Sequence, residues 1–387
     1  MAEFEFSSLK QEYESFREPK VRVFIDGREL DSGQPIAVTD VEVELTAGYE
    51  ASIATLTLTG VYDIESRSFE IKKTKQFMYL GSTVVIYMGY AMSLREVFRG
   101  FIAKVHFIVP EPGGEEYPSV ELTCMDVKGL MMANRHSKKL KAIYYSDAVR
   151  EILEAYPIFS ERDAGGGLFM EMNISTTPDK PPGASGGGRE TTDRRVEMVE
   201  ESDYDFMVKA AKRYNFDFFI VGNTLYFIEA KKNQNPLLVL KPNSGMLNID
   251  VGYDMTGLVK EVVVRNIDMA QGKYIGDRKK SKNKISLGNK AKPLVEKQSL
   301  VYIDPTTDSK EEAGYRASYL METIDYRLGS VTGEFLGIPE LVPGRFVTLE
   351  GFGTPVNNDF YLMNVKHIYV DGRYRTVFEG CANSIGK

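Results

Sequence analysis

The chain has 387 residues, a mass of 43.5 kDa and a formal net charge of −7, enough polypeptide for two or three domains. Hydrophobic residues make up 43% and charged residues 27%, a globular balance that excludes wholesale disorder and a fibrous chain. The acidic balance argues against a dedicated nucleic-acid binder, so we expect no specific nucleic-acid binding. Tyr and Phe are plentiful while Trp is absent, which favours β-strands.

The sequence contains no signal for a membrane or for an oxidising compartment. No run approaches the ~18–20 apolar residues that a membrane helix needs, so we expect no stable membrane insertion. The acidic, amphipathic N-terminus lacks the basic start and apolar centre of a signal peptide. Two cysteines, Cys124 and Cys381, are too few for a disulfide framework. Synthesis in the cytoplasm is the default expectation.

Residues 1–19 have the pattern of a short amphipathic helix. Apolar side chains recur at helical spacing through Phe6, Leu9, Tyr13 and Phe16, and Pro19 ends the pattern. A helix this short is marginal by itself and must dock on something. It either covers its own β domain or docks on a partner subunit, and the sequence leaves both alternatives open.

Residues 20–128 predict a first β-barrel. The segments VRVFI, VEVEL and TLTLT alternate apolar with polar residues, as half-buried strands do. Asp26-Gly27 is a hairpin signal. At least six short strands with glycine between them suggest a barrel or a sandwich.

Residues 129–245 predict an α/β insert. Ser146 is a plausible N-cap for a first helix, and Ser202 with Asp205 resembles a capping box at the start of a second. A hairpin with a Gly222-Asn223 turn follows the second helix. The Gly/Pro/Ser-rich stretch at 165–188 predicts a mobile loop.

The rest of the chain returns to strands and carries an insertion. Strand patterns at 246–272 and 328–385 predict a second β-barrel, with a hairpin turn at Asp371-Gly372. Between them, 273–327 contains a basic loop followed by a helix from about Ser309. The expected fold class is mainly β with α+β inserts: two similar, tube-like β-barrel domains plus an α/β insert domain.

A search for chemistry finds no persuasive catalytic, cofactor or metal site. His106 and His367 lie in strand patterns, where a structural role is expected, and His136 lies among basic residues, where solvation is expected. The two distant cysteines give no zinc spacing. The G-x-S-x-G match at 183–187 falls in the low-complexity loop rather than between a strand and a helix, and we interpret it as false.

The strongest charge feature is a basic run in the insertion. It either contacts an acidic partner or phosphates, or is a solvated loop. The candidate partner-contact residues are Arg278, Lys279, Lys280, Lys282 and Lys284.

Three stretches together are similar to a known family. Glu200–Glu229 starts with an acidic-Ser-Asp segment and a Phe, and continues through a helix and a hairpin; Gly333–Gly353 has Pro-Gly before a strand; and Phe360–Val370 has an aromatic residue followed by His six residues later. In this order they resemble the phage late control gene D and VgrG families, with 80–135 similar to their first barrel. The residues that carry the motifs are Ser202, Asp203, Phe206, Pro343, Gly344, Tyr361 and His367. The helix and the basic insertion depart from the family pattern, and we expect no fused spike of the kind that VgrG proteins carry.

The resemblance implies a baseplate hub of a contractile tail or injection system. Such hubs are homotrimers that adapt a hexameric tail tube to a trimeric spike. The implied partners are further copies of the chain, the tail tube protein, the spike protein and other baseplate subunits. The implied location is a bacterial cytoplasm during synthesis and a baseplate after assembly. Two alternatives remain: a peptidoglycan-degrading tail enzyme, and a receptor- or glycan-binding tail module.

Overall fold

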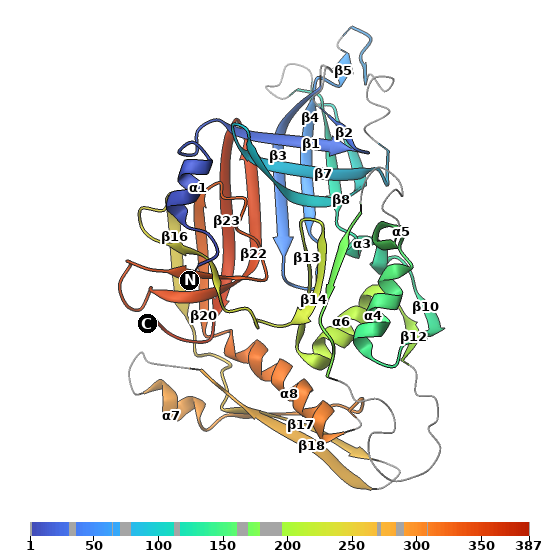
Figure 1. Ribbon diagram of the computed structural model, residues 1–387, viewed down its shortest axis with the longest axis vertical. Coiled ribbons are helices and arrows are strands. Elements are labelled where there is room, and N and C mark those ends of the chain that lie inside the picture. Colours follow the sequence, from blue (N-terminus) through green and yellow to red (C-terminus); the bar gives the residue numbers. More distant parts are fainter. Residues whose placement is uncertain are drawn as a thin grey trace.

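The computed structural model describes residues 2–30, 36–63, 65–69, 79–111, 117–160, 169–178, 196–268, 272–283, 290–307 and 309–386. The predicted mainly-β fold class is confirmed in its coarse form: a large sheet is accompanied by small sheets and short helices. Figure 1 shows three parts: the large sheet above, an α/β unit beside its lower end, and a sheet–helix unit beneath. Residues 183–187, most of the predicted mobile loop, and Lys284 lie outside the described residues.

The large sheet has thirteen strands and contains both segments that predicted barrels. The main path runs β16-β20-β23-β22-β3-β4-β9-β8-β7-β1-β2, and β21 joins β15 to β22. The strands are β1 (Pro19–Ile25), β2 (Arg28–Glu29), β3 (Ala37–Thr46), β4 (Ile53–Thr59), β7 (Thr83–Tyr90), β8 (Ser93–Ile108), β9 (Ser119–Met125), β15 (Pro236–Leu240), β16 (Met246–Tyr253), β20 (Gly329–Leu336), β21 (Phe346–Leu349), β22 (Asn358–Val370) and β23 (Arg373–Ala382).

The prediction of two separate barrels is wrong in two respects, because the described strands of both segments share one sheet and close no barrel. Strand β3 from the first segment pairs antiparallel with β22 from the second, over seven residue pairs from Asp40↔Val370 to Thr46↔Asn364. The ladders between described strands close neither segment into a barrel. The register explains the join, because it places buried Val41 and Val43 opposite Tyr369 and His367, so that the apolar faces of both halves point the same way.

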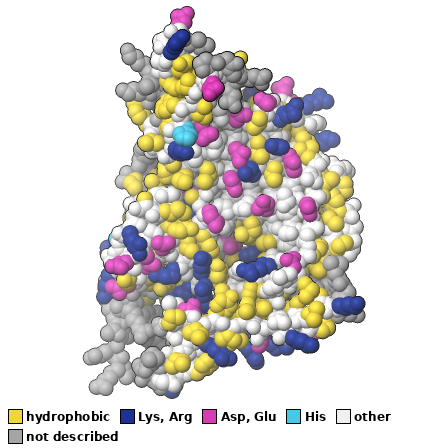
Figure 2. All heavy atoms as spheres, turned by 180° about the vertical axis from the view of Figure 1, so that it is seen from behind, with side chains coloured by type: hydrophobic (Ala, Val, Ile, Leu, Met, Phe, Trp, Pro, Cys, Tyr) yellow, Lys and Arg dark blue, Asp and Glu magenta, His cyan; other side chains and the backbone are white. Residues whose placement is uncertain are grey.

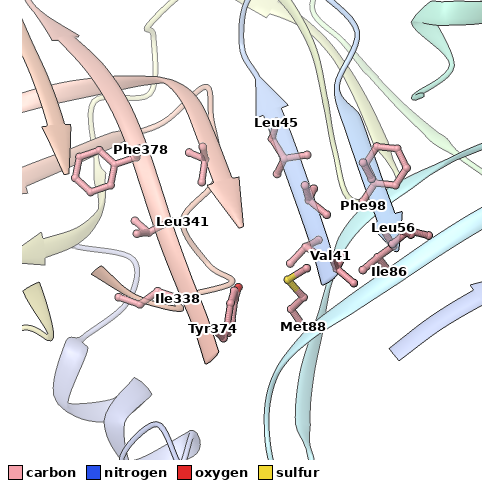
Figure 3. Packing of buried hydrophobic residues seen from close by; sticks show 14 of the residues in the cluster. Val41, Leu45, Leu56, Ile86, Met88, Phe98, Ile338, Leu341, Tyr374 and Phe378 are labelled. Carbon is pink, nitrogen blue, oxygen red and sulfur yellow. The ribbon is translucent and has the colours of Figure 1, made fainter. Parts of the chain in front are cut away.

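One hydrophobic core runs through both halves of this sheet. Leu45, Leu56 and Phe98 from one half belong to the same cluster as Leu341 and Phe378 from the other, and Figure 3 shows Tyr374 and Met88 between these two groups. Tyr90 on β7 and Tyr374 on β23 bring their ring centroids to 5.7 Å, so aromatic packing connects the halves as well as the β3–β22 ladder.

The N-terminal helix packs on its own chain. Helix α1 (Phe6–Glu12) buries Leu9, and Tyr13 just after it is fully buried beneath Glu340 and Tyr90. The alternative in which this helix covers its own β domain is therefore confirmed. The helix is shorter than predicted, because residues 14–16 have positive φ and turn the chain toward β1.

The α/β unit contains α3 (Lys128–Met132), β10 (His136–Lys139), α4 (Tyr145–Glu154), α5 (Pro157–Ser160), β11 (Glu171–Ile174), β12 (Glu197–Glu201), α6 (Asp203–Tyr214), β13 (Phe216–Val221) and β14 (Thr224–Glu229). The capping box and the hairpin are confirmed. Two predictions are wrong. Ser146 lies inside α4, where its N–H donates to Thr177. Within the predicted 165–188 loop, β11 pairs in parallel with β14, because backbone pairing beside a strand outweighs loop-like composition.

The third unit combines a three-stranded sheet with a helix. Its sheet has the order β18-β17-β19, and its elements are β17 (Glu261–Asp268), β18 (Lys273–Lys280), α7 (Ala291–Val295), β19 (Ser299–Ile303) and α8 (Lys310–Asp325). The prediction that placed β17 in the second barrel is wrong, since Val262 and Val264 bury their side chains in a cluster with α8 instead. The predicted basic loop is also partly wrong, because Arg278–Lys280 lie in β18. A small ladder of β5 (Tyr62–Asp63) and β6 (Ser68–Phe69) completes the described strands.

The Pro343-Gly344 turn lies against the α/β unit. Gly344 has φ of +80°, and a Cβ added there would collide with the ring of Phe219 on β13. Gly353 has nearly the same φ, +83°, but nothing lies within 4 Å of an added Cβ. A side chain at Gly353 would therefore meet backbone strain alone, whereas one at Gly344 would meet the same strain and a steric overlap with Phe219.

We predict that Gly344→Ala destabilises the protein more than Gly353→Ala does. Both variants carry the strain of a side chain at positive φ, ~1 kcal/mol, and the overlap with Phe219 adds roughly 1–3 kcal/mol to the first. Urea unfolding followed by circular dichroism measures the difference. Equal midpoints for the two variants would show that the approach of Phe219 does not constrain the fold.

Candidate interaction surfaces and the junctions that support them

The start of α6 is built from three of the residues that the sequence singles out. The Ser202 hydroxyl accepts from the Asp205 N–H at 3.0 Å, and Asp205 accepts in return from the Ser202 N–H. The two reciprocal bonds satisfy donors that a helix N-terminus leaves open. Phe206 is fully buried and stacks on Tyr145 at 5.7 Å between centroids. These residues fix the helix.

Asp203 connects α6 to three other segments. Its carboxylate accepts from Asn134 and from the Tyr156 hydroxyl, both at 2.6 Å, and lies 3.1 Å from Nε2 of His136. The His136 side chain is 38% exposed, in line with the predicted solvation, and the register of β10 against β12 also brings its ring to Asp203. Through these contacts Asp203 links the start of α6 to Asn134, Tyr156 and His136.

Tyr361 lies at the junction of the three parts. Its hydroxyl donates to Asp217 on β13 at 2.5 Å, and the ammonium of Lys231 lies 4.7 Å from its ring centroid. Lys231 also pairs with Glu322 on α8 at 3.1 Å. Burial alone would lower the pKa of Lys231, but Asp217 and Glu322 outweigh it and raise the pKa above its ordinary value. Lys231 therefore stays charged and joins β13, α8 and β22.

A second buried lysine holds the other side of the α/β unit. Lys128 lies 4.0 Å from Asp126, donates to backbone oxygens of Gly48 and Glu50, and faces the ring of Phe218 on β13 at 5.6 Å. Burial lowers the pKa of Lys128 and raises the pKa of Asp126. The attraction between the two opposite charges shifts each pKa in the other direction but does not outweigh burial. Sequence reasoning missed both lysines, because an isolated Lys gives no signal of burial.

His367 belongs to the core. It is fully buried on β22, where its Nδ1 lies 2.9 Å from the Tyr374 hydroxyl and 3.2 Å from that of Thr376. Burial lowers the pKa of His367 to about 4, so the ring is neutral near pH 7. Its place in a strand agrees with the predicted structural role.

The basic candidates separate onto two surfaces of the sheet–helix unit. The register of β17 against β18 places Arg278 and Lys280 on the face away from α8, opposite Val263 and Glu261, and Lys279 on the face toward α8, opposite Val262. Lys282 follows the strand, and its N–H donates to Asp325.

A cleft of about 540 Å³ lies between α8, the end of β18 and the loop after β14. Cationic side chains of Lys279, Lys282 and Lys231 line it together with the carboxylates of Glu322 and Asp325. The cleft thus contains charges of both signs. Lys231 already pairs with Glu322, and Asp325 already accepts from the Lys282 N–H.

Within the described ranges, no group of three or more His, Cys, Asp and Glu is placed to hold a metal ion. Among the described helices, none is long and apolar enough to cross a membrane.

The architecture matches a class of proteins from phage tails and related secretion machines. A tail protein from Neisseria meningitidis superposes with a TM-score of 0.64 at 11% identity, covering 94% of this chain and 97% of that one. A 43 kDa tail protein of prophage MuSo2 from Shewanella oneidensis gives 0.62 at 9% identity, with coverage of 94% and 98%.

A component of the E. coli type VI secretion system also shares the fold, with a TM-score of 0.53 at 12% identity over 92% of this chain and 76% of that one. That component is itself described as structurally similar to the T4 bacteriophage tail proteins gp27 and gp5. The expected resemblance to late control D and VgrG-like proteins is confirmed for the fold. No protein-family profile and no curated protein matches the sequence.

We predict that Lys231→Met destabilises the protein strongly, by ~3 kcal/mol, because it leaves Asp217 and Glu322 without their shared cation. The matched control is Lys232→Met, since Lys232 is 74% exposed and pairs with the exposed Glu229. The control should lie within ~0.5 kcal/mol of the parent. Thermal and urea unfolding of the three proteins measure the effect. Comparable losses in both variants would contradict a joining role for Lys231.

We predict a loss of stability on acidification that depends on His367. Its pKa of about 4 in the folded chain lies below its ordinary 6.5, so the unfolded state binds the proton first. The stabilising contribution is complete above pH 6.5 and is lost as the pH falls toward 4, a change of ~3 kcal/mol.

Urea unfolding at several pH values tests the role of His367. His367→Gln should flatten the pH dependence between pH 7 and 4, whereas His106→Gln, at an exposed strand position, should follow the parent. If the free energy of unfolding changed with pH in the same way for the parent and for His367→Gln, His367 would not be the group responsible.

Proposed function

We propose that this protein is a non-enzymatic structural component of the baseplate of a contractile tail or injection system, and that it works as a homotrimeric hub between tail tube and spike. The observation that carries the proposal is the shared fold: two phage tail proteins match over 94% of this chain and nearly all of their own length. A secretion-system component described as similar to T4 tail proteins extends the likeness to injection machines.

The large sheet supports a hub geometry. Each copy carries two β halves, one made of β1–β4 and β7–β9 and the other of β15, β16 and β20–β23, joined by one ladder and one core. Three copies would present six such halves, a number that suits contact with a hexameric tube on one side and a trimeric spike on the other. The proposed partners are accordingly further copies of the chain, a tube protein, a spike protein and other baseplate subunits, in a particle assembled in a bacterial cytoplasm.

The singled-out polar residues also fit a structural component. Ser202 and Asp203 secure a helix, Tyr361 joins two units and His367 lies in the core. Each forms hydrogen bonds to other residues of the chain; Ser202 and Asp203 lie at the start of α6, and Tyr361 and His367 lie on β22. This arrangement supports a scaffold more directly than the enzyme or glycan-binding alternatives.

We predict that the purified protein forms a species near three times 43.5 kDa in multi-angle light scattering across a concentration series. A stable dimer would contradict the threefold geometry. A second measurement tests the role itself: bacteria that express the whole tail gene cluster without this gene should yield no complete particles, and re-expression of the gene should restore them. Normal particles without the gene would overturn the proposed function.

A further inference from the structure

The sheet of β18, β17 and β19 has one face packed on α8 and one face turned outward. Val262 and Val264 on β17 are buried in the cluster with α8. The alternating residues Val263, Arg265 and Ile267 therefore point to the opposite side. This second face is called the outer face below.

The outer face is apolar and basic. Its exposed apolar side chains are Ile303, 82% exposed, Tyr274 at 61%, Ile267 at 58% and Val301 at 51%, and the register places them on the same side. Arg265, Arg278 and Lys280 lie among them, with Glu261 as the acidic side chain of the face. A cluster of large apolar groups beside cations is typical of an interaction surface.

The strand at the border of this face is β19. Among the described strands, β19 pairs with β17 alone, and all five of its residues are exposed. Natural edge strands are usually blunted by Lys, Pro or a bulge. The sequence Ser-Leu-Val-Tyr-Ile contains neither Lys nor Pro, and its register against β17 has no irregularity. By contrast, β1 near one end of the large sheet carries Pro19, Lys20 and Arg22.

Charge indicates what covers the outer face. Residues 260–307 contain eleven Lys and Arg against five Asp and Glu, a formal charge of +6. Since the whole chain is −7, all other residues together carry −13. Figure 2 agrees: at the lower end of the face it shows, hydrophobic and Lys or Arg side chains predominate, while Asp and Glu are more frequent above. A second copy of this chain therefore offers an acidic surface to a basic one.

We infer that the outer face, with the open edge of β19, docks on the acidic body of a neighbouring copy of this chain. The two surfaces in such a contact are different, so the contact is heterologous and repeats around a ring until the rotation closes. The inference rests on the homotrimer of the proposed function and identifies one side of its subunit contact.

The area of the outer face indicates how much of the contact between subunits it can supply. Three strands of five to eight residues cover roughly 15 Å by 25 Å, about half of the ~800 Å² per partner that a standard interface buries. The outer face is therefore part of a larger subunit contact. Replacing Ile303 by a charged residue should weaken association by roughly 10- to 100-fold.

The first experiment compares subunit association in variants by light scattering and sedimentation across a concentration series. Ile303→Lys and the double variant Val301→Lys/Arg278→Glu should shift the midpoint of assembly upward by at least tenfold. Met92→Lys is the matched control, because Met92 is 90% exposed and lies in the hairpin between β7 and β8. Circular dichroism melts check folding, which substitutions at such exposed positions should leave unchanged.

The second experiment identifies the surface that receives the outer face. Copies labelled with ¹⁵N are mixed with unlabelled copies, and a carbodiimide joins contacting amines and carboxylates. Peptides that combine labelled and unlabelled halves should link Lys280 to an Asp or Glu outside residues 260–307. Lys280→Arg keeps the charge but lacks the amine, so it should lose these crosslinks without losing assembly.

The outcomes separate this inference from the proposed function. A trimer that survives the sheet-face variants, or that Met92→Lys weakens equally, overturns the inference and leaves the hub proposal standing. A parent protein that stays monomeric at every concentration overturns both the inference and the homotrimer. Binding of a fluorescent single-stranded DNA that Arg278→Glu abolishes, with no change in assembly, would assign the face to nucleic acid and also overturn the inference.

Discussion

The structure depends on strand β13, where the need to pair buried charges connects all three parts of the molecule. Three consecutive residues on this strand each make a different connection. Asp217 accepts from Tyr361 of the large sheet and helps to hold Lys231 charged beside α8. Phe218 faces Lys128, and Phe219 lies against Gly344. Because a buried ammonium without partners is costly, neither Lys128 nor Lys231 tolerates a large shift of β13.

This arrangement suits a component that connects other proteins. The α/β unit is attached to the large sheet through Lys128 on one side and to α8 through Lys231 on the other. The large sheet in turn shares one core between its two halves. The three parts can therefore keep a fixed relation to one another, as the hub proposed above would require.

Sequence reasoning succeeded where the signal is local. The Ser202 capping box and the hairpins at Asp26-Gly27, Gly222-Asn223 and Asp371-Gly372 follow from a few adjacent residues, and all are present. The shared fold was also foreseen, because motifs at 200–229, 333–353 and 360–370 occur in the expected order.

The remaining features could not be predicted, because they are set by partners far away in the chain. The alternating pattern of β17 specifies one buried face but not whether α8 or a barrel covers it. Likewise, the pattern of β3 does not name β22 as its neighbour. The burial of Lys231 depends on Asp217, Glu322 and Tyr361, which come together only in the folded chain. Patterns therefore specify faces, and long-range packing decides what each face meets.

The uneven charge of the chain bears on how copies of an acidic protein could assemble. Copies with a net charge of −7 repel at long range, yet salt screens exposed charges over ~8 Å at physiological ionic strength. At contact only neighbouring charges matter, and in the proposed contact Arg265, Arg278 and Lys280 of the outer face would lie beside carboxylates of the next copy. Concentrating cations on one unit thus makes one orientation of approach attractive and leaves most others repulsive, which favours a defined ring over random aggregation. The apolar side chains Ile303, Val301 and Tyr274 would then supply affinity where the charges supply orientation.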